Sequence, residues 1–408
     1  MIKKAVFVVF DGLCDRPLKE FGGKTPLEHA KTPNLDAIAK RSQCGLMHPL
    51  GFGKKPGSDV SHLNILGYPY DQYYTGRGPI EVAGLGIKLQ DGDVAFRGNF
   101  GSVDGNWNIL DRRCGRIKDV TEFAAAIDGL EIDDIKLIVK PGTAYRAGVV
   151  LRGKGLSAAI SDCDPHEEGK PVMTVKPTDN TKQAAFTAAV LNKFLRKTNE
   201  ILNAMATNKQ RVKDGLVPAN FLLVRGAGVV PTMQPFHEKF GMRAACIAGG
   251  GLYKGIGSFL GMDVLSVPGA TGMPDTDVAA KCNAVVKSLE SYDFVFCHIK
   301  ASDSLGEDGN HVGKKEFIEK ADKAMAILAK LPDDVLLVIT ADHTTPCELK
   351  THSADPVTIL FCNPSCRIDD VQEIGERAFA KGGLGRIDGK DVMTQIMNLM
   401  GKLHLVGA

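Results

Sequence analysis

The sequence predicts an α/β protein in which helices flank a mostly parallel sheet and a smaller α+β domain is inserted into it. Short, continuous apolar runs recur along the chain, as expected of parallel strands that are covered on both faces. Helical patterns alternate with these runs, whereas a middle stretch is more polar. At 408 residues the chain is too long for one simple core. We therefore expect a core of residues 1–96 and 216–408 and an insert of residues 97–215.

Seven apolar runs are the candidate strands of the core. The first, AVFVVF, follows a basic start and superficially resembles a signal peptide, but Asp11 interrupts it and no small-residue cleavage site follows. We therefore interpret it as a buried strand. The seven runs cover residues 5–10, 219–224, 244–248, 263–267, 294–299, 335–340 and 356–362.

The helices and turns have recognisable signals. TPNLDAIAKRS offers Thr32 as an N-cap and Pro33 at the first helical position. Apolar residues recur at helical spacing in 275–292 and 314–331. Within the insert, Asp104-Gly105 predicts a hairpin, and residues 181–215 carry a long polar helical pattern.

The charge and cysteine content exclude several classes of protein. Lysine plus arginine (50) and aspartate plus glutamate (48) nearly balance, which gives no electrostatic basis for binding nucleic acid or an anionic membrane. The apolar runs are far shorter than the ~20 residues of a membrane span. The ten cysteines are scattered without a CxxC pair, as is typical of reduced thiols, so we expect a cytoplasmic protein.

Acidic and histidine side chains follow three of the predicted strands. Asp11 follows the first, Asp303 follows FVFCHI, and Asp342-His343 follows VLLVITA. Ligands of open α/β sheets bind at the carboxyl ends of the strands, so these residues are expected to share one crevice with His352. One such aspartate is usually a turn former or an N-cap. Several together repel one another unless a cation compensates, which favours a pair of divalent cations.

The segment KASDSLGEDGNH, residues 300–311, raises a separate question. Asp303 and Glu307 are four residues apart, so a helix there places their Cβ atoms about 5–6 Å apart on one face. The segment is either a solvated acidic loop or half of a metal site. The carboxylates at the other strand ends favour the metal site.

Ser58 directly follows Gly57 and precedes a helical pattern in FGKKPGSDVSHLNILGY. Serine is a good N-cap, which is one interpretation. The other is a nucleophile, because a helix N-terminus presents free N–H groups to a phosphate and a metal activates a hydroxyl without a histidine base. With a metal pair nearby, we favour the nucleophile.

Several arginines lie beside glycines, where a guanidinium can bind a carboxylate or phosphate through two hydrogen bonds. Lys300 and His166 are weaker candidates for the same role. The glycine-rich GGGLYKGIG lacks GxGxxG spacing, so we expect no dinucleotide site there. The arginines are Arg77, Arg97, Arg112, Arg113, Arg116, Arg146 and Arg225.

Taken in order, eight segments resemble the cofactor-independent phosphoglycerate mutases of the archaeal type, which belong to the alkaline phosphatase superfamily. The resemblance covers essentially the whole chain. It implies an alkaline-phosphatase-like fold and interconversion of 3-phosphoglycerate and 2-phosphoglycerate through a phosphoserine, without 2,3-bisphosphoglycerate, in glycolysis and gluconeogenesis. The segments are FDGLCDRP, PGSDVSHLNILGY, YYTGRGPIE, GDVAFRGNF, DRRCGRI, SDCDPHE, TADHTTP and KGGLGRI.

The resemblance also implies the site residues. The first metal would be held by Asp11, Ser58, Asp342 and His343, and the second by Asp303, residue 307 and His352. The residues expected to be catalytic are Ser58, Lys300 and Arg112. Those expected to bind phosphoglycerate are Arg77, Arg113, Arg116, Arg146, Arg225 and His166.

The chain departs from this family at one ligand, because the family has a histidine where this sequence has Glu307. Glutamate offers an oxygen donor, so we expect Glu307 to ligate and Mn²⁺ or Mg²⁺ to be favoured, with Zn²⁺ as the further option. The alternatives are that His311 supplies the missing ligand or that the second metal binds poorly.

Two other functions share these residues. One is a metal-dependent phosphomonoesterase, and the other is a non-catalytic phosphometabolite-binding protein with an impaired second metal site. A mutase requires that water be kept from the phosphoserine, and a closing lid would explain the inserted domain. Phosphoglycerate is the expected partner, with no nucleic acid and no membrane, and the sequence does not specify an oligomeric state.

Overall fold

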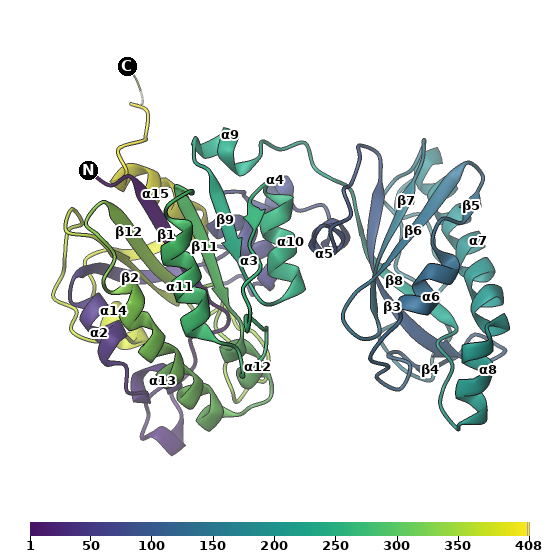
Figure 1. Cartoon of the computed structure of the whole chain (residues 1–408), viewed down its shortest axis with the longest axis horizontal. Coiled ribbons are helices and arrows are strands. Elements are labelled where there is room, and N and C mark those ends of the chain that lie inside the picture. Colours follow the sequence, from purple (N-terminus) through teal and green to yellow (C-terminus); the bar gives the residue numbers. More distant parts are fainter. Residues whose placement is uncertain (406, 408) are drawn as a thin grey trace. The chain divides into compact units, whose positions relative to one another are not determined.

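The computed structural model describes residues 1–405 and 407, and the chain divides into two compact units (Figure 1). The first unit is Met1–Tyr74 with Met233–Ala408, and the second is Thr75–Thr232. The predicted insert of residues 97–215 lies within the second unit.

The first unit is built on an eight-stranded sheet with the order β10-β9-β11-β1-β12-β13-β2-β14. The predicted parallel arrangement is confirmed from β10 to β12. It is wrong for the run 356–362, which forms β13 antiparallel to both neighbours, because residues 342–356 contain no crossover helix. The strands are β1 Lys4–Phe10, β2 Ser42–His48, β9 Ala244–Ile247, β10 Asp263–Val264, β11 Phe294–Ile299, β12 Val335–Ala341, β13 Val357–Cys362 and β14 Gly385–Asp388.

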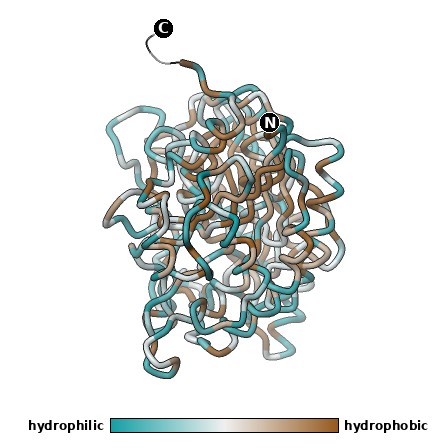
Figure 2. The backbone as a smooth tube through the Cα atoms, turned by 90° about the vertical axis from the view of Figure 1, so that its left-hand side faces the viewer, coloured by the Kyte–Doolittle hydropathy of each residue, from teal (hydrophilic) through white to brown (hydrophobic). Residues whose placement is uncertain are grey.

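The interpretation of the N-terminal run as a buried strand is confirmed. β1 lies between β11 and β12, and from Ala5 to Phe10 no side chain is more than 1% exposed. Strands covered on both faces read as continuous apolar runs, as β1, β11 and β12 do. In Figure 2 the hydrophobic segments of the chain lie inside and the hydrophilic segments outside.

Helices cover this sheet, and α11 packs against β9 and β11 with α13 beside it (Figure 1). Pro33 begins α2 as predicted, although the Thr32 hydroxyl donates to Asp36 instead of capping the helix. The helices are α1 Pro26–His29, α2 Pro33–Ala39, α3 Ser58–Ile65, α4 Tyr70–Tyr73, α9 Phe236–Phe240, α10 Gly251–Phe259, α11 Val278–Ser288, α12 Ala301–Glu307, α13 His311–Leu328, α14 Glu376–Phe379 and α15 Val392–Leu399, with 3₁₀ turns η1 Lys19–Phe21 and η2 Gly389–Asp391.

The second unit is an antiparallel sheet with helices packed on it, and its order is β4-β3-β7-β6-β5 with β8 also paired to β3. The hairpin at Asp104-Gly105 is confirmed, and it joins β3 to β4. The long polar pattern forms two helices that meet at Met205. The elements are α5 Arg77–Gly84, β3 Val94–Val103, β4 Ile109–Asp111, α6 Thr121–Ile127, β5 Glu131–Ile132, β6 Ile135–Pro141, β7 Arg146–Arg152, α7 Lys182–Ala204, α8 Ala206–Lys213 and β8 Phe221–Gly228.

One predicted strand belongs to a different sheet from the one expected. The run 219–224 does form a strand, β8, but this strand pairs antiparallel with β3 in the second unit and not with the core sheet. Phe221 and Leu223 of β8 join Phe194 of α7 in the hydrophobic core of this unit. An apolar run predicts a buried strand, but its partner strand depends on contacts distant in sequence.

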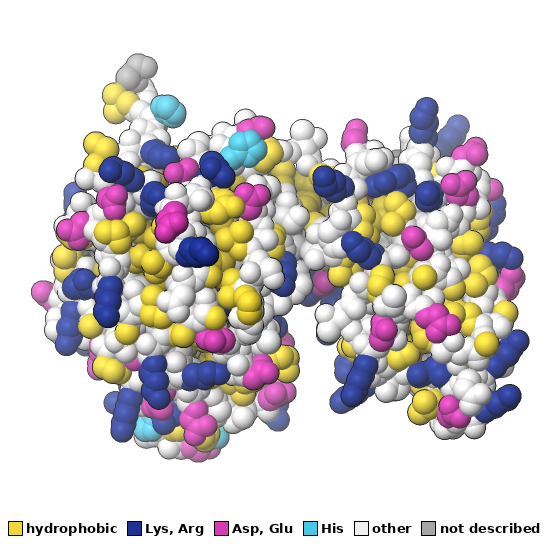
Figure 3. Space-filling model, viewed as in Figure 1, with side chains coloured by type: hydrophobic (Ala, Val, Ile, Leu, Met, Phe, Trp, Pro, Cys, Tyr) yellow, Lys and Arg dark blue, Asp and Glu magenta, His cyan; other side chains and the backbone are white. Residues whose placement is uncertain are grey.

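Three further observations concern helix length, cysteine pairing and surface charge. No helix in the described part of the chain is long and apolar enough to cross a membrane. All ten cysteines are unpaired. In Figure 3, basic and acidic side chains are interspersed on the visible face of each unit, as the balanced composition predicts.

Candidate metal centre

The predicted acidic residues come together because three neighbouring parallel strands end at the same level. Phe10, the last residue of β1, pairs with the last residues of β11 and β12, Ile299 and Ala341. Asp11 and Asp342 therefore leave adjacent strands side by side, and both side chains are fully buried. The chain after β11 turns into α12, whose first turn carries the likewise buried Asp303.

Asp11, Asp342 and His343 form the first group that could hold a metal, with ligand atoms within 4.8 Å of one another. His343 Nε2 lies 3.2 Å from Asp11 Oδ1 and 3.2 Å from Asp342 Oδ2. Ser58 Oγ lies 3.2 Å from the same nitrogen. Ser58 is the first residue of α3, and Gly57 is the N-cap, so the serine is not the cap residue.

Asp303, His343 and His352 form the second group. His352 Nε2 lies 3.5 Å from Asp303 Oδ1, and its ring stacks on that of His343 with 3.6 Å between centroids. His352 Nδ1 donates to the Pro56 carbonyl at 2.8 Å, since a carbonyl can only accept. The lone pair of Nε2 therefore faces Asp303, which is the form of histidine that binds a metal.

Glu307 lies at the edge of this second group. Its Oε1 is 3.9 Å from His352 Nε2, and its side chain is 53% exposed. Burial of the carboxyl and the nearby Asp303 raise the pKa of Glu307. His311, the alternative ligand, packs its ring against Phe21 with 5.3 Å between centroids and is not in either metal-binding group.

The carboxylates at this centre fit a cation. Asp11 Oδ1 and Asp342 Oδ2 are buried and make no hydrogen bond to any described residue. Burial, followed by repulsion from Asp11, raises the pKa of Asp342 well above its usual range. Burial also acts to raise the pKa of Asp11, but the charge of Lys300 and the nearby His298 and His343 hold it well below the usual range. The repulsion between these two buried carboxyls is what a divalent cation would compensate.

Lys300 lies against both metal-binding groups. Its Nζ donates to Asp303 Oδ2 at 2.8 Å and to Asp11 Oδ2 at 3.3 Å. Burial and Asp11 act to raise the pKa of Asp303, but the nearby His352 and the charge of Lys300 lower it to about 2. Asp303 is therefore ionised at neutral pH.

Gly12 allows the three loops to approach this closely. Its φ is +60°, and a Cβ at this position would lie 2.5 Å from Thr345 Oγ1 and 2.8 Å from the Asp303 Cα. The Thr345 hydroxyl donates to Asp303 Oδ1 at 2.9 Å and accepts from His343 Nδ1 at 3.0 Å. The Nε2 lone pair of His343 is therefore available for a metal.

Three residues that the sequence analysis did not single out contact the buried aspartates. His62 Nδ1 donates to the Ser58 carbonyl at 2.7 Å and lies 3.4 Å from Asp342 Oδ2. His298 Nε2 lies 3.3 Å from Asp11 Oδ2, and the Tyr253 hydroxyl donates to the same oxygen. His298 could have been recognised from the sequence, because it is a histidine inside the otherwise apolar run FVFCHI.

These histidines are neutral. Burial lowers the pKa of His62 to about 3 and that of His298 to about 4. They therefore lie against the carboxylates of Asp342 and Asp11 without adding positive charge.

The second unit gathers predicted substrate-binding residues around Asp164. Arg112 donates two hydrogen bonds to this buried carboxylate, from Nε to Oδ1 at 2.9 Å and from NH2 to Oδ2 at 2.6 Å. Arg225 NH1 lies 3.7 Å from Asp164 Oδ2. Both guanidiniums also contact His166 Nδ1, at 3.3 Å for Arg112 and 3.1 Å for Arg225. Burial acts to raise the pKa of Asp164, but Arg112 lowers it below its usual range.

The remaining predicted arginines lie in the same unit. Arg113 and Arg116 line an open pocket together with Arg112 and His166. Arg113 and Arg146 both lie over the Tyr145 ring, at 5.9 and 5.3 Å from its centroid. Arg77 instead donates to Glu81 at 2.9 Å.

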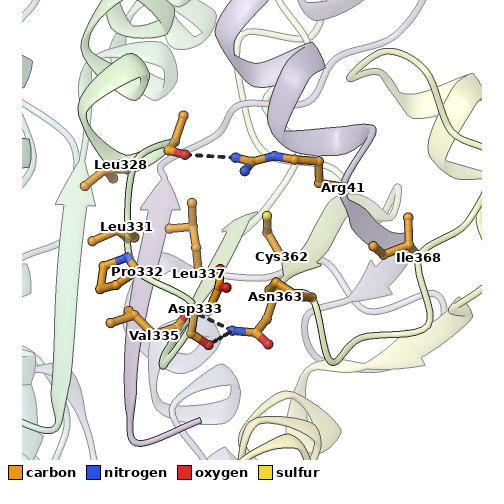
Figure 4. A pocket seen from close by; sticks show the side chains of 12 residues that line it. Arg41, Leu328, Leu331, Pro332, Asp333, Val335, Leu337, Cys362, Asn363 and Ile368 are labelled. Carbon is orange, nitrogen blue, oxygen red and sulfur yellow. Dashed lines mark hydrogen bonds between the residues drawn. The ribbon is translucent and has the colours of Figure 1, made fainter. Parts of the chain in front are cut away.

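A separate cavity lies at the opposite end of β12 from the metal centre (Figure 4). It is lined by residues at the start of β12, such as Val335, and at the end of β13, such as Cys362. Arg41 at its edge donates to the Ala329 carbonyl at 2.9 Å. It contains none of the predicted site residues.

Comparisons with known proteins show the family to which the chain belongs. Residues 3–399 match the model of the Metalloenzyme superfamily. The chain is 48% identical over 409 residues to "2,3-bisphosphoglycerate-independent phosphoglycerate mutase 1" of Methanocaldococcus jannaschii, covering 99% of each chain. It is 46% identical over 407 residues to the 2,3-bisphosphoglycerate-independent phosphoglycerate mutase of Methanococcus aeolicus, covering 99% of this chain and 100% of that one.

Solved structures have the same fold. A Pyrococcus horikoshii protein superposes with a TM-score of 0.86 at 35% identity, covering all of both chains. A cofactor-independent phosphoglycerate mutase from Thermoplasma acidophilum has a TM-score of 0.76 at 38% identity, covering 98% of this chain and 100% of that one.

Proposed function

The chain belongs to the 2,3-bisphosphoglycerate-independent phosphoglycerate mutases of the Metalloenzyme superfamily, and on that premise we propose that it interconverts 3-phosphoglycerate and 2-phosphoglycerate through a phosphoserine on Ser58. The observation that carries the proposal is the position of Ser58 at the N-terminus of α3, 3.2 Å from a histidine of the metal-binding groups. The comparisons do not favour a phosphomonoesterase or a non-catalytic binding protein.

We assign the metal ligands in two sets. Asp11, Ser58, Asp342 and His343 would hold one divalent cation, and Asp303, Glu307 and His352 the other. When bound, the cations would lower the pKa of the Ser58 hydroxyl and neutralise charge on the transferring phosphoryl group. The carboxylate-rich donor set favours Mn²⁺ or Mg²⁺, with Zn²⁺ as the further option.

The reaction consists of two phosphoryl transfers. Ser58 Oγ loses its proton and attacks the phosphorus of 3-phosphoglycerate; the bond from phosphorus to the C3 oxygen breaks and that oxygen takes up a proton. The C2 hydroxyl of the glycerate then attacks the phosphoserine, which yields 2-phosphoglycerate and regenerates Ser58. Free N–H groups at the start of α3 support the negative charge on the phosphoryl group.

Lys300 is proposed as the second catalytic residue. Although burial acts to lower its pKa, Asp11 and Asp303 raise it, so the ammonium stays protonated. A protonated lysine beside the nucleophile can donate a hydrogen bond to the transferring group in each step.

The arginines of the second unit are proposed to bind the anionic groups of phosphoglycerate. Arg112 is held rigidly by Asp164, and His166 and Arg225 complete that cluster. Arg113, Arg116, Arg146 and Arg77 supply further positive charge. The ten unpaired cysteines fit a reducing compartment, which supports the expected cytoplasmic location.

The test is capture of the phosphoserine. The chain is mixed with 3-phosphoglycerate and a divalent cation, quenched, digested and searched for a phosphorylated Ser58 peptide. We expect S58A to lose both the captured phosphate and turnover, while S42A, which removes a buried hydroxyl of β2, retains both. Turnover by S58A at the wild-type rate would reject Ser58 as the nucleophile.

A further inference from the structure

Arg97 of β3 has a buried guanidinium whose hydrogen bonds are incomplete. Its side chain is 18% exposed, and its Nε is buried without a hydrogen-bond partner among the described residues. The nearest carboxylate oxygen, Glu81 Oε1, is 3.8 Å away, which is too far for a hydrogen bond. That oxygen already accepts from Arg77 Nε at 2.9 Å. Leaving a charged donor buried and unsatisfied is unfavourable, so such a group in a folded protein needs an explanation.

The surroundings of Arg97 are strongly positive. Arg225 of β8 lies directly opposite Arg97 in the sheet, and like charges at such positions destabilise it. Arg146 begins β7, the strand on the other side of β3. Burial and the nearby Arg77 and Arg225 lower the pKa of Arg97, and Glu81 opposes them; together they bring it to about 10.

The same sheet shows that the fold can satisfy an arginine. Arg152 of β7 donates from Nε to Asp93 Oδ1 at 2.9 Å and from NH2 to Asp93 Oδ2 at 2.6 Å. This side chain is 28% exposed, so its burial is comparable to that of Arg97. The incomplete hydrogen bonding of Arg97 is therefore particular to its position and not a general property of the sheet.

We propose that Arg97 is a further substrate-binding residue, and that it binds the carboxylate of phosphoglycerate. This inference rests on the proposed function for the identity of the anion. The phosphoryl group is assigned to Ser58 and the metal ligands, which leaves the carboxylate for a guanidinium. The planar guanidinium matches a carboxylate through two parallel hydrogen bonds.

Glu81 partly compensates the charge of Arg97. It is the one carboxylate within 4 Å of Arg97 in the described part of the chain, and it is shared with Arg77. An incoming carboxylate competes with Glu81 for these cations. Removing the negative charge of Glu81 should therefore strengthen anion binding.

The test is ligand binding to the full chain in the presence of Mn²⁺, measured by calorimetry with three probes in the S58A background so that 3-phosphoglycerate is not turned over. 3-Phosphoglycerate carries both anionic groups, D-glycerate has only the carboxylate, and glycerol 3-phosphate has only the phosphate. We expect R97Q to weaken binding of 3-phosphoglycerate and D-glycerate about tenfold or more, as for loss of a hydrogen bond to a charged group, and to leave glycerol 3-phosphate unchanged. R97K should restore part of the loss, and E81Q should tighten carboxylate binding.

R152Q is the matched control, since it breaks a satisfied arginine–aspartate pair in the same sheet. It should lower the ligand-free Tm and leave all three affinities unchanged. R97Q should not lower the ligand-free Tm, because it removes an unsatisfied buried charge.

Three outcomes overturn the proposal. Unchanged affinities in R97Q with a lowered Tm would make Arg97 purely structural. If R97Q weakened glycerol 3-phosphate binding equally, Arg97 would bind the phosphate and not the carboxylate. If D-glycerate did not bind to the wild type, there would be no carboxylate-binding subsite. None of these measurements involves turnover. A failure of the proposed mutase activity would therefore appear in a separate assay and would be distinguishable from a failure of this proposal.

Discussion

Glu307 occupies the position at which this chain departs from the histidine that its resemblance to the family implies. Its carboxylate lies 3.9 Å from His352 Nε2 on a half-exposed side chain at the end of α12. Burial and Asp303 raise its pKa, and this repulsion is what a cation between the carboxylates would relieve.

Substitution of Glu307 tests this role. E307A should lower Mn²⁺ affinity at one of two sites by about tenfold or more, that is, about 1.4 kcal/mol or more. E307H should restore affinity and shift the preference towards Zn²⁺, because a nitrogen ligand replaces an oxygen. Electron paramagnetic resonance of Mn²⁺ during titration measures the Mn²⁺ affinity of each variant, and the same titration in competition with Zn²⁺ measures the metal preference. D308A, which alters the adjacent exposed carboxylate, is the control, and wild-type Mn²⁺ affinity in E307A would contradict the assignment.

Helix α13 connects the loops that carry the metal ligands through one buried lysine. Lys314 Nζ donates to Asp15 Oδ2 at 2.8 Å, to the Cys14 carbonyl at 3.1 Å and to the Thr345 carbonyl at 2.9 Å. Lys314 and Asp15 side chains are fully buried. The loop after β1 and the loop after β12 are thereby fixed to the same helix.

Breaking this pair should affect stability and metal binding together. K314M leaves Asp15 buried and uncompensated, which should lower the free energy of unfolding by about 3–5 kcal/mol. It should also weaken Mn²⁺ binding, because Thr345 contacts Asp303 and His343. Chemical denaturation and Mn²⁺ titration measure the two effects.

A control on the same helix separates these effects. Asp322 accepts hydrogen bonds from the backbone N–H groups at the start of α2 and does not contact either loop. D322N should therefore lower stability while Mn²⁺ affinity is retained. Equal Mn²⁺ affinity in K314M and the wild type would show that the lysine stabilises the fold without positioning the ligands.

The elements differ in how far the sequence predicts them. β1, β11 and β12 were predictable because they are continuous apolar runs. The helix carrying Asp303 and Glu307 was considered only as the condition under which both carboxylates lie on one face. The direction of β13 and the sheet to which β8 belongs were predicted wrongly, because neither property is encoded in the run itself. His62, Tyr253 and Arg97 acquire their surroundings only through contacts distant in sequence.

The stability of the whole molecule should depend on pH through Glu376. Burial raises its pKa to about 7, although hydrogen bonds from the Thr25 hydroxyl and the Asp15 N–H lower it. The unfolded chain releases this proton near pH ~4.3, so between that pH and about 7 the folded state binds more protons. Stability contributed by the protonated form is therefore lost as pH rises through this window.

The variant E376Q tests this pH dependence. Glutamine is neutral at every pH, so the variant should lose less stability than the wild type between pH 4.5 and pH 8. Thermal unfolding across this range gives the comparison, with E373Q at a neighbouring exposed position as the control. Parallel Tm curves for E376Q and the wild type would mean that Glu376 does not titrate in this window.

The two units carry different parts of the proposed chemistry. The first unit contains the nucleophile and every proposed metal ligand, and the second contains the arginine cluster around Asp164. The motifs predicted both sets of residues, since strand-end carboxylates and glycine-flanked arginines are visible in the sequence. Their protonation was not predictable, because it depends on burial and on neighbouring charges.

The most direct test of the central claim is phosphorus NMR of 3-phosphoglycerate with the metal-stripped chain, before and after addition of Mn²⁺ and without 2,3-bisphosphoglycerate. We predict that a 2-phosphoglycerate signal appears only after Mn²⁺ is added, with no inorganic phosphate. Inorganic phosphate in place of 2-phosphoglycerate, or no change with any divalent cation, would contradict a metal-dependent mutase.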